Sequence, residues 1–231
     1  MRTTYQVANA REQQLAAART FGATDDVQLA LAGICYAEHA ALWCDESIDL
    51  AAYRATAPGP LWPWNATHWA PSDPRQDLER AAAMIIAQVD LLDLARREAL
   101  AVAPTVELAQ WRQDYAPGAS TRPGCFRVRT IHEVANAATE LCADSLNRGP
   151  DDDVQLALAG IAYAEHAALW ADENIDLADY RAADPGDQWP WKAVLWAPTT
   201  PRGDLVRAAA LIIAQIKTFD HAHLEWSAAG D

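Results

Sequence analysis

Carboxylates at the end of an otherwise apolar stretch are the first residues in this sequence whose types and spacing suit chemistry. Glu38, Asp45 and Asp49 follow one another at helical steps of three or four, counting Leu42 between them, and so share one face of a predicted helix. Oxygen ligands on one face are what Mg²⁺ takes from a protein, with water and substrate phosphate completing its shell. Mg²⁺ is the one cofactor predicted. Its predicted ligands are Glu38, Asp45, Glu46, Asp49, Glu165, Asp172, Glu173 and Asp176.

The same acids also have structural interpretations. Asp45, Glu46 and Asp49 would equally form a solvated helix end or cap the turn that follows. Glu38 stands among apolar residues, where an unpaired carboxylate is unfavourable by several kcal/mol. We therefore expect Glu38 to pair with a cation such as Arg80, to bind a ligand, or to lie beside a cavity. The neighbouring histidine is predicted to belong to the core or to an interface.

Tryptophans and arginines give the second chemical signal. A W-P-W motif at 62–64 and a further tryptophan at 69 crowd one short loop, which prolines stiffen. Indole faces stack on nucleobases, and arginine forks on the following helix suit phosphate. Alternatively, the indoles anchor the loop to the helices, and Asp77 with Arg80 forms a helix-surface ion pair. The predicted ligand-binding residues are Trp62, Trp64, Trp69, Arg75, Arg80, Trp189, Trp191, Trp196, Arg202 and Arg207.

Both signals occur twice because the chain contains an internal duplication. Residues 25–89 and 152–216 align without a gap at an offset of 127, and 48 of the 65 paired positions are identical. A doubled chain builds within one molecule the twofold arrangement that two subunits would otherwise make. Any site is therefore expected twice, or at the junction of the copies. The predicted organisation is a first copy over 1–102, a linker over 103–130 and a second copy over 131–231.

The elements that must position these residues are predicted to be helices. Alanine and leucine dominate the 51% of apolar residues, and glycine is scarce, which favours helix over strand. In the first copy we expect helices over 5–19, from 25 to at least 43, and from 74 to about 100. Whether the second of these runs straight through Asp49 or bends before a short helix ending at 55 stays open. In the second copy, helices are expected over 132–146, from 152 and over 201–219. The predicted fold is all-α, with two three-helix units packed as a pseudo-twofold bundle.

Composition excludes several classes of protein. A formal net charge of −14 opposes general binding to nucleic acid or to an anionic membrane, so an anionic ligand must be held locally. The four cysteines show no C-x-x-C spacing, and the chain opens without an apolar signal segment, which predicts a cytoplasmic protein with reduced thiols. The sequence has no glycine-rich phosphate loop, no G-x-S-x-G motif and no cysteine–histidine nucleophile arrangement.

Two resemblances are carried by particular motifs. The motifs that carry the first resemblance are the W-P-W, the W-x-P at 69–71 and the D-L-x-R-A-A-A run that opens 77–88. Over about 65 residues, each copy resembles a small helical domain of bacteriophages and prophages. This resemblance implies a phage origin and no established activity. D-E-S-I-D at 45–49 and D-E-N-I-D at 172–176 resemble half of the acidic signature of MazG-type all-α nucleotide pyrophosphohydrolases. Arg80 stands where the last acid of the other half would be.

The predicted function is that of a phage-type accessory protein that sequesters a nucleotide or nucleotide-derived signal, as counteracting a host defence signal would require. Sequestration needs affinity and no turnover, which fits an incomplete set of catalytic acids. One alternative is Mg²⁺-dependent pyrophosphate release from a nucleoside triphosphate, as the MazG resemblance implies. Another is an acidic inhibitor or DNA mimic that binds a host protein. Assembly into a homo-oligomer stays open.

Overall fold

The computed structural model describes residues 3, 6–7, 9–12, 27–43, 49–102, 125–145, 154–170 and 176–229. Every regular element within these residues is helical, as predicted. The first copy contains α2 (Gln28–Leu42), α3 (Leu50–Ala55), the short 3₁₀ turn η1 (Ala66–His68) and α4 (Pro74–Val102). The described residues at 3–12 are also helical.

The second copy repeats this order. It contains α7 (Gln155–Leu169), α8 (Leu177–Ala182), η2 (Ala193–Leu195) and α9 (Pro201–Ala229), preceded by α6 (Cys125–Ser145). The helix α6 begins inside the segment predicted as linker, most of which lies outside the described residues. The helix α9 continues ten residues past the predicted end at Phe219, because the following sequence contains no proline or glycine until Gly230.

The predicted alternative of one straight helix through Asp49 is wrong. The helix α2 ends at Leu42, and Asp49 begins α3 as its N-cap, with its carboxylate accepting from the amides of Ala51 and Ala52 at 2.9 and 3.3 Å. A capping carboxylate satisfies amides that have no partner within the helix. The acids at 38 and 49 therefore belong to different helices.

The start of α2 is capped by a different helix. Its N-cap, Val27, has no side chain that can accept a hydrogen bond. The side chain of Gln88 on α4 accepts instead from the amides of Leu29 and Ala30, at 3.1 and 3.3 Å. In the second copy Gln215 accepts from Ala157 in the same way. The pairing of α2 with α4 is thus fixed by polar as well as apolar contacts.

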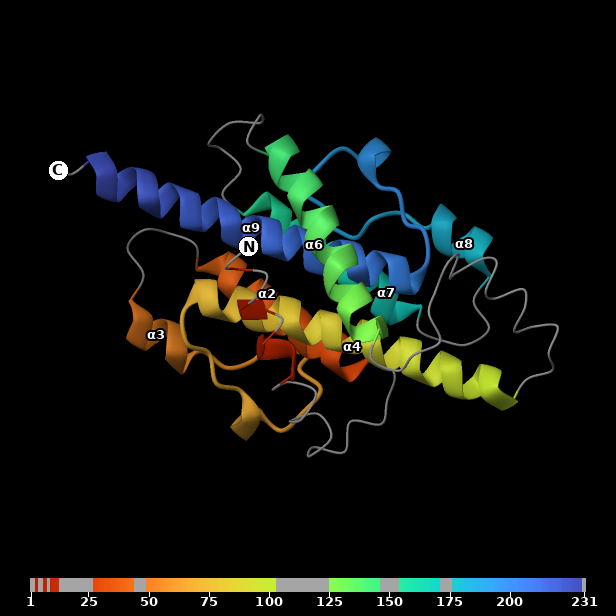
Figure 1. Ribbon diagram of the computed structural model, residues 1–231. Coiled ribbons are helices and arrows are strands. Elements are labelled where there is room, and N and C mark those ends of the chain that lie inside the picture. The colour runs from red at the N-terminus through yellow and green to blue at the C-terminus, as the bar shows by residue number, and fades with distance from the viewer. Residues whose placement is uncertain are drawn as a thin grey trace.

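The two copies pack together around the long helices. Figure 1 shows α4 and α9 side by side and running in opposite directions, with α3 and α8 at opposite ends of the molecule. The helix α2 packs on α4, α7 packs on α9, and α2 also contacts α7, while α6 lies across α9. The molecule therefore consists of two similar helix groups related by a pseudo-twofold axis, as the duplication predicts.

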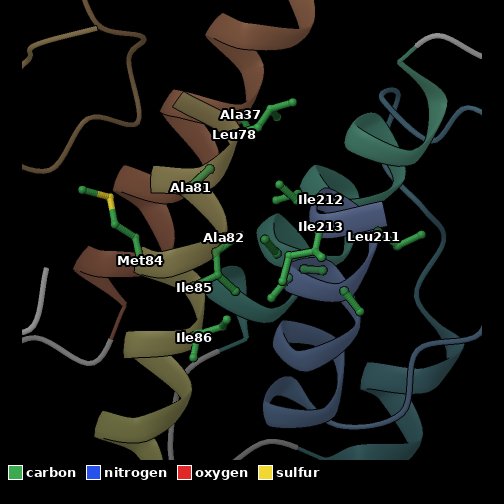
Figure 2. Packing of buried hydrophobic residues seen from close by; sticks show 14 of the residues in the cluster. Ala37, Leu78, Ala81, Ala82, Met84, Ile85, Ile86, Leu211, Ile212 and Ile213 are labelled. Carbon is green, nitrogen blue, oxygen red and sulfur yellow. The ribbon is translucent and has the colours of Figure 1, made fainter. Parts of the chain in front are cut away.

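The core lies between these helices and consists of alanine and branched aliphatic residues. Figure 2 shows Ile85 and Ile86 of α4 pointing toward α9, from which Ile212 and Ile213 point back. All four side chains are buried, and burying each stabilises the fold by about 1.5–3 kcal/mol. The alanines beside them, at 81–83 and 208–210, are buried as well. Their small side chains let the helices approach closely.

Within the helices that the structure describes, none is both long and apolar enough to cross a membrane.

A close contact between two helices within each copy is made at a glycine, which gives a test of the packing. A Cβ added to Gly33 would lie 3.0 Å from the carbonyl oxygen of Ala81 and 3.0 Å from Ile85, whereas one added to Gly186 would meet no atom within 4 Å. Helix propensity favours alanine by up to about 1 kcal/mol. We nevertheless expect Gly33→Ala to lower the free energy of unfolding by about 1–2 kcal/mol, because backbone atoms must move. Urea denaturation measures this, with Gly186→Ala as the control, and equal stability of the two variants would contradict the packing.

Candidate functional site

A buried carboxylate organises the residues predicted to bind a ligand. Asp77, in the first turn of α4, is fully buried, and its Oδ2 accepts from the hydroxyl of Tyr53 at 2.7 Å. Ser72 donates to Asp77 from its amide at 3.2 Å and from its hydroxyl at 3.1 Å. Burial raises the pKa of Asp77, and the bond from Tyr53 and the charge of Arg80 oppose the rise. The prediction of a surface pair was wrong in one respect: Asp77 and Arg80 do pair, at 3.2 Å, but the carboxylate is interior.

Arg80 joins this carboxylate to an aromatic cluster. Its guanidinium carbon lies 4.7 Å from the ring centre of Tyr36, and Trp69 stacks on the same tyrosine with ring centres 4.4 Å apart. The Nη1 of Arg80 donates to the carbonyl of Ala70 at 2.6 Å and to Asp77. Contacts to a ring, a carbonyl and a carboxylate fix the orientation of the guanidinium.

The predicted tryptophans are anchored in a segment that we call the first tryptophan loop, residues 56–73. Trp62 contacts Tyr36, Trp64 and Trp69 edge to face, with ring centres 5.1–5.6 Å apart. Every indole N–H of this cluster has an acceptor: the side chain of Gln28 for Trp64, and backbone carbonyls for the other two. The indoles therefore hold the loop on α2, while all three remain partly exposed.

The second tryptophan loop, residues 183–200, repeats this arrangement. Asp204 accepts from Tyr180 at 2.7 Å, and Arg207 lies 4.9 Å from the ring centre of Tyr163 and donates to the carbonyl of Ala197 at 2.6 Å. The distance from Arg207 to Asp204 is longer, at 3.9 Å. The predicted tryptophans of this copy contact one another and the tyrosine as in the first: Trp189, Trp191 and Trp196.

The two predicted arginine pairs have different environments. Arg75 donates to Asp220 of the other copy through Nε at 2.6 Å and Nη2 at 3.0 Å, and Arg202 donates to Asp93 at 2.6 and 2.9 Å. These are reciprocal bidentate bridges between the copies, so a phosphate at either arginine would have to displace an aspartate. By contrast, Arg80 and Arg207 make all their hydrogen bonds to described residues through Nη1.

No three of the predicted metal ligands come together within the described residues. Asp49 and Asp176 cap α3 and α8 with their carboxylates, and four others lie outside the described residues: Asp45, Glu46, Asp172 and Glu173. The described part of the chain contains no group of three or more histidines, cysteines or acids that could hold a metal ion. Mg²⁺ binding stays a prediction.

Glu38 and Glu165 meet at the junction of the copies. The Nε2 of Gln188 donates to Glu38 at 2.9 Å and lies 3.5 Å from Glu165, so one amide bridges the equivalent acids of α2 and α7. Glu38 thus does not pair with Arg80. Burial, and then the charge of Glu38, raise the pKa of Glu165. Burial, and then the charge of Glu38, also raise the pKa of the Cys35 thiol to about 12.

The histidines next to these acids are buried, as predicted. The Nε2 of His39 donates to the carbonyl of Tyr53 at 3.1 Å, and His166 donates to the carbonyl of Tyr180 at 3.0 Å. Burial lowers the pKa of both imidazoles. Each ring holds the short helix after it against α2 or α7.

Sequence reasoning missed the tyrosine that completes this site. Tyr53 and Asp77 recur as Tyr180 and Asp204 at identical positions of the two copies, and this shared conservation within the chain was the available signal. Neither spacing nor periodicity places a tyrosine from α3 over the first turn of α4, because a loop of irregular backbone separates them.

Comparison with protein-family models, with curated proteins and with solved structures gave no match to this chain. The resemblances to a phage domain and to MazG-type enzymes stay predictions.

The reciprocal bridges predict an additive contribution to stability. We expect Asp93→Asn and Asp220→Asn each to lower the free energy of unfolding by about 1 kcal/mol, since each bridge is bidentate but partly exposed. The double variant should lose about the sum, because the two bridges are separate. Chemical denaturation at low and high salt measures this, with Asp179→Asn on the exposed face of α8 as the control. Losses no larger than that of the control would show that the bridges do not hold the copies together.

The glutamate pair predicts a pH dependence with a definite sign. Because the folded-state pKa of Glu165 is raised above its ordinary 4.5, its contribution to stability is complete below that pH and is lost as pH rises through the raised value. We expect Glu165→Gln to be more stable than the parent protein near pH 8, with the difference disappearing near pH 5. Thermal melts across this range measure it, with Asp179→Asn as the control. A difference that does not change with pH would contradict the assignment.

Proposed function

We propose that this protein binds and sequesters a phosphorylated small molecule, a nucleotide or nucleotide-derived signal, at Arg80 and Arg207. The observation that carries the proposal is the unused edge of each guanidinium. Within the described residues, Nη1 makes every hydrogen bond of these two arginines, so Nε and Nη2 are available together. Their side chains are 27% and 36% exposed.

An edge of this kind suits a phosphate. Nε and Nη2 present two parallel N–H groups that match two oxygens of one phosphate. The guanidinium is already oriented by its tyrosine ring and by a backbone carbonyl, so little freedom is lost when an anion binds. A free arginine on a flexible stem would lose more.

The tryptophan loops supply the apolar side of the proposed site. Tyr36 contacts both Trp69 and the guanidinium of Arg80. Trp62 packs against the rings of Tyr36 and Trp69 and remains partly exposed. A nucleobase next to a phosphate on Arg80 would contact this partly exposed aromatic surface. The same arrangement in the second copy supports two sites per chain.

Sequestration rather than turnover is supported by how the nearby acids are used. Asp77 is occupied by Tyr53, Ser72 and Arg80, and Asp49 caps a helix. A net charge of −14 means that affinity must come from these local groups and not from a general positive field. Holding a signal without consuming it is the role expected of a phage accessory protein that counters host defence.

The proposal predicts that binding depends on the arginine fork and not only on its charge. We expect Arg80→Lys together with Arg207→Lys to weaken nucleotide binding about tenfold or more, because lysine keeps the charge but offers no parallel pair of N–H groups. Binding is measured by titrating the protein with a panel of nucleotides and with inorganic phosphate, and is monitored by tryptophan fluorescence and by calorimetry. The matched control is Arg96→Lys, an exposed arginine farther along α4.

Three outcomes of the titration count against the proposal. No binding of any phosphorylated compound by the parent protein removes it, as does binding that the double variant leaves unchanged. Release of pyrophosphate in the presence of Mg²⁺ would replace sequestration by the enzymatic alternative.

A further inference from the structure

Glu38 lies close to both tryptophan loops. Its Oε1 accepts from Gln188, which lies in the second tryptophan loop, at 2.9 Å. Gly59, in the first tryptophan loop, lies near the same side chain: a Cβ there would be 3.5 Å from Oε2 of Glu38 and 3.9 Å from the sulfur of Cys35. One carboxylate of the first copy therefore accepts a bond from the second loop and lies near the backbone of the first.

This contact is not repeated in the other direction. The counterpart of Gln188 in the first loop is Leu61, whose side chain has no amide and is 38% exposed. The counterpart of Gly59 is Gly186, where a Cβ would meet nothing within 4 Å. The two loops share most of their sequence and the same aromatic contacts, yet only position 188 of the pair 61/188 carries an amide that can bond to the opposite copy.

We propose that Gln188 and Glu38 form a strap that ties the second tryptophan loop to the opposite half of the molecule and makes it the less mobile of the two loops. A hydrogen bond to a carboxylate is among the stronger ones, and this one is partly buried. Gln188 directly precedes Trp189, so the strap restrains the chain at the point where the aromatic cluster begins. The first loop has leucine at this position, so it cannot form the equivalent bond to Glu165.

The strap also explains how two like charges are accommodated at the junction. Gln188 places the positive end of one amide dipole between Glu38 and Glu165, with no cation within ion-pair distance of either acid in the described part of the chain. A leucine in its place would leave the two carboxylates without this donor. The strap acts on the loop itself and does not depend on ligand binding.

Amide hydrogen exchange of the full chain tests the strap. In the parent protein, protection factors corrected for sequence should be higher over 185–197 than over the equivalent 58–70. Gln188→Leu, which installs the residue of the first loop, should lower protection of the second loop about fivefold and leave the first within about twofold. Asp187→Asn, an exposed neighbour in the same loop, serves as the matched control and should change neither loop.

A double-mutant cycle separates the strap from general loosening. Glu38→Ala should lower protection of the second loop as Gln188→Leu does, and the double variant should lose no more than either single variant. Equal protection of the two loops in the parent protein would overturn the proposal. So would a Gln188→Leu variant with unchanged exchange, or losses that add in the double variant.

Discussion

The antiparallel contact of α4 with α9 is the constraint on which the rest of the structure depends. Both helices contribute buried alanines and isoleucines to the core between them. Each also packs closely against a glycine of a neighbouring helix: α4 against Gly33 of α2, and α9 against Gly160 of α7. Small residues at these positions let the backbones approach, so that dispersion contacts accumulate over the length of the helices. Each tryptophan loop is bonded to the helices of its own copy, α2 and α4 or α7 and α9, so the contact of α4 with α9 sets how the two loops lie relative to each other.

The pseudo-twofold axis created by this contact has opposite effects on different charges. Where an arginine faces an aspartate across the axis, symmetry gives two favourable bridges, Arg75 with Asp220 and Arg202 with Asp93. Where a residue lies near the axis, it faces its own equivalent, and Glu38 therefore meets Glu165. A chain that carries both copies is not held to strict symmetry, and Gln188 differs from Leu61 at the position where one donor serves both acids. Covalent duplication thus allows a single glutamine to serve both acids, whereas two identical subunits would each have to carry the same residue at that position.

The predictions that succeeded were those that depend on one helix or on the repeat. Helical periodicity placed α2, α4, α7 and α9, and the offset of the repeat placed equivalent residues in equivalent surroundings. Predictions that required a partner from another element were weaker. The pairing of Asp77 with Tyr53, the capping of α2 by Gln88 and the bond from Gln188 to Glu38 all join residues from separate elements. Spacing along the chain carries no information about which of several helix faces will meet.

By itself, the sequence determined the helical class, the duplication and the residue types available to a site, because these follow from local propensity and from identity at a fixed offset. Only the tertiary structure decided which of those side chains are held by partners from other helices. It placed Arg75 in a bridge between copies, whereas the bonds of Arg80 to described residues all run through Nη1, although the two arginines stand five residues apart on one helix. The physical reason is that a side chain's partner is set by the direction from which another helix approaches, and that direction arises from the packing of the whole core.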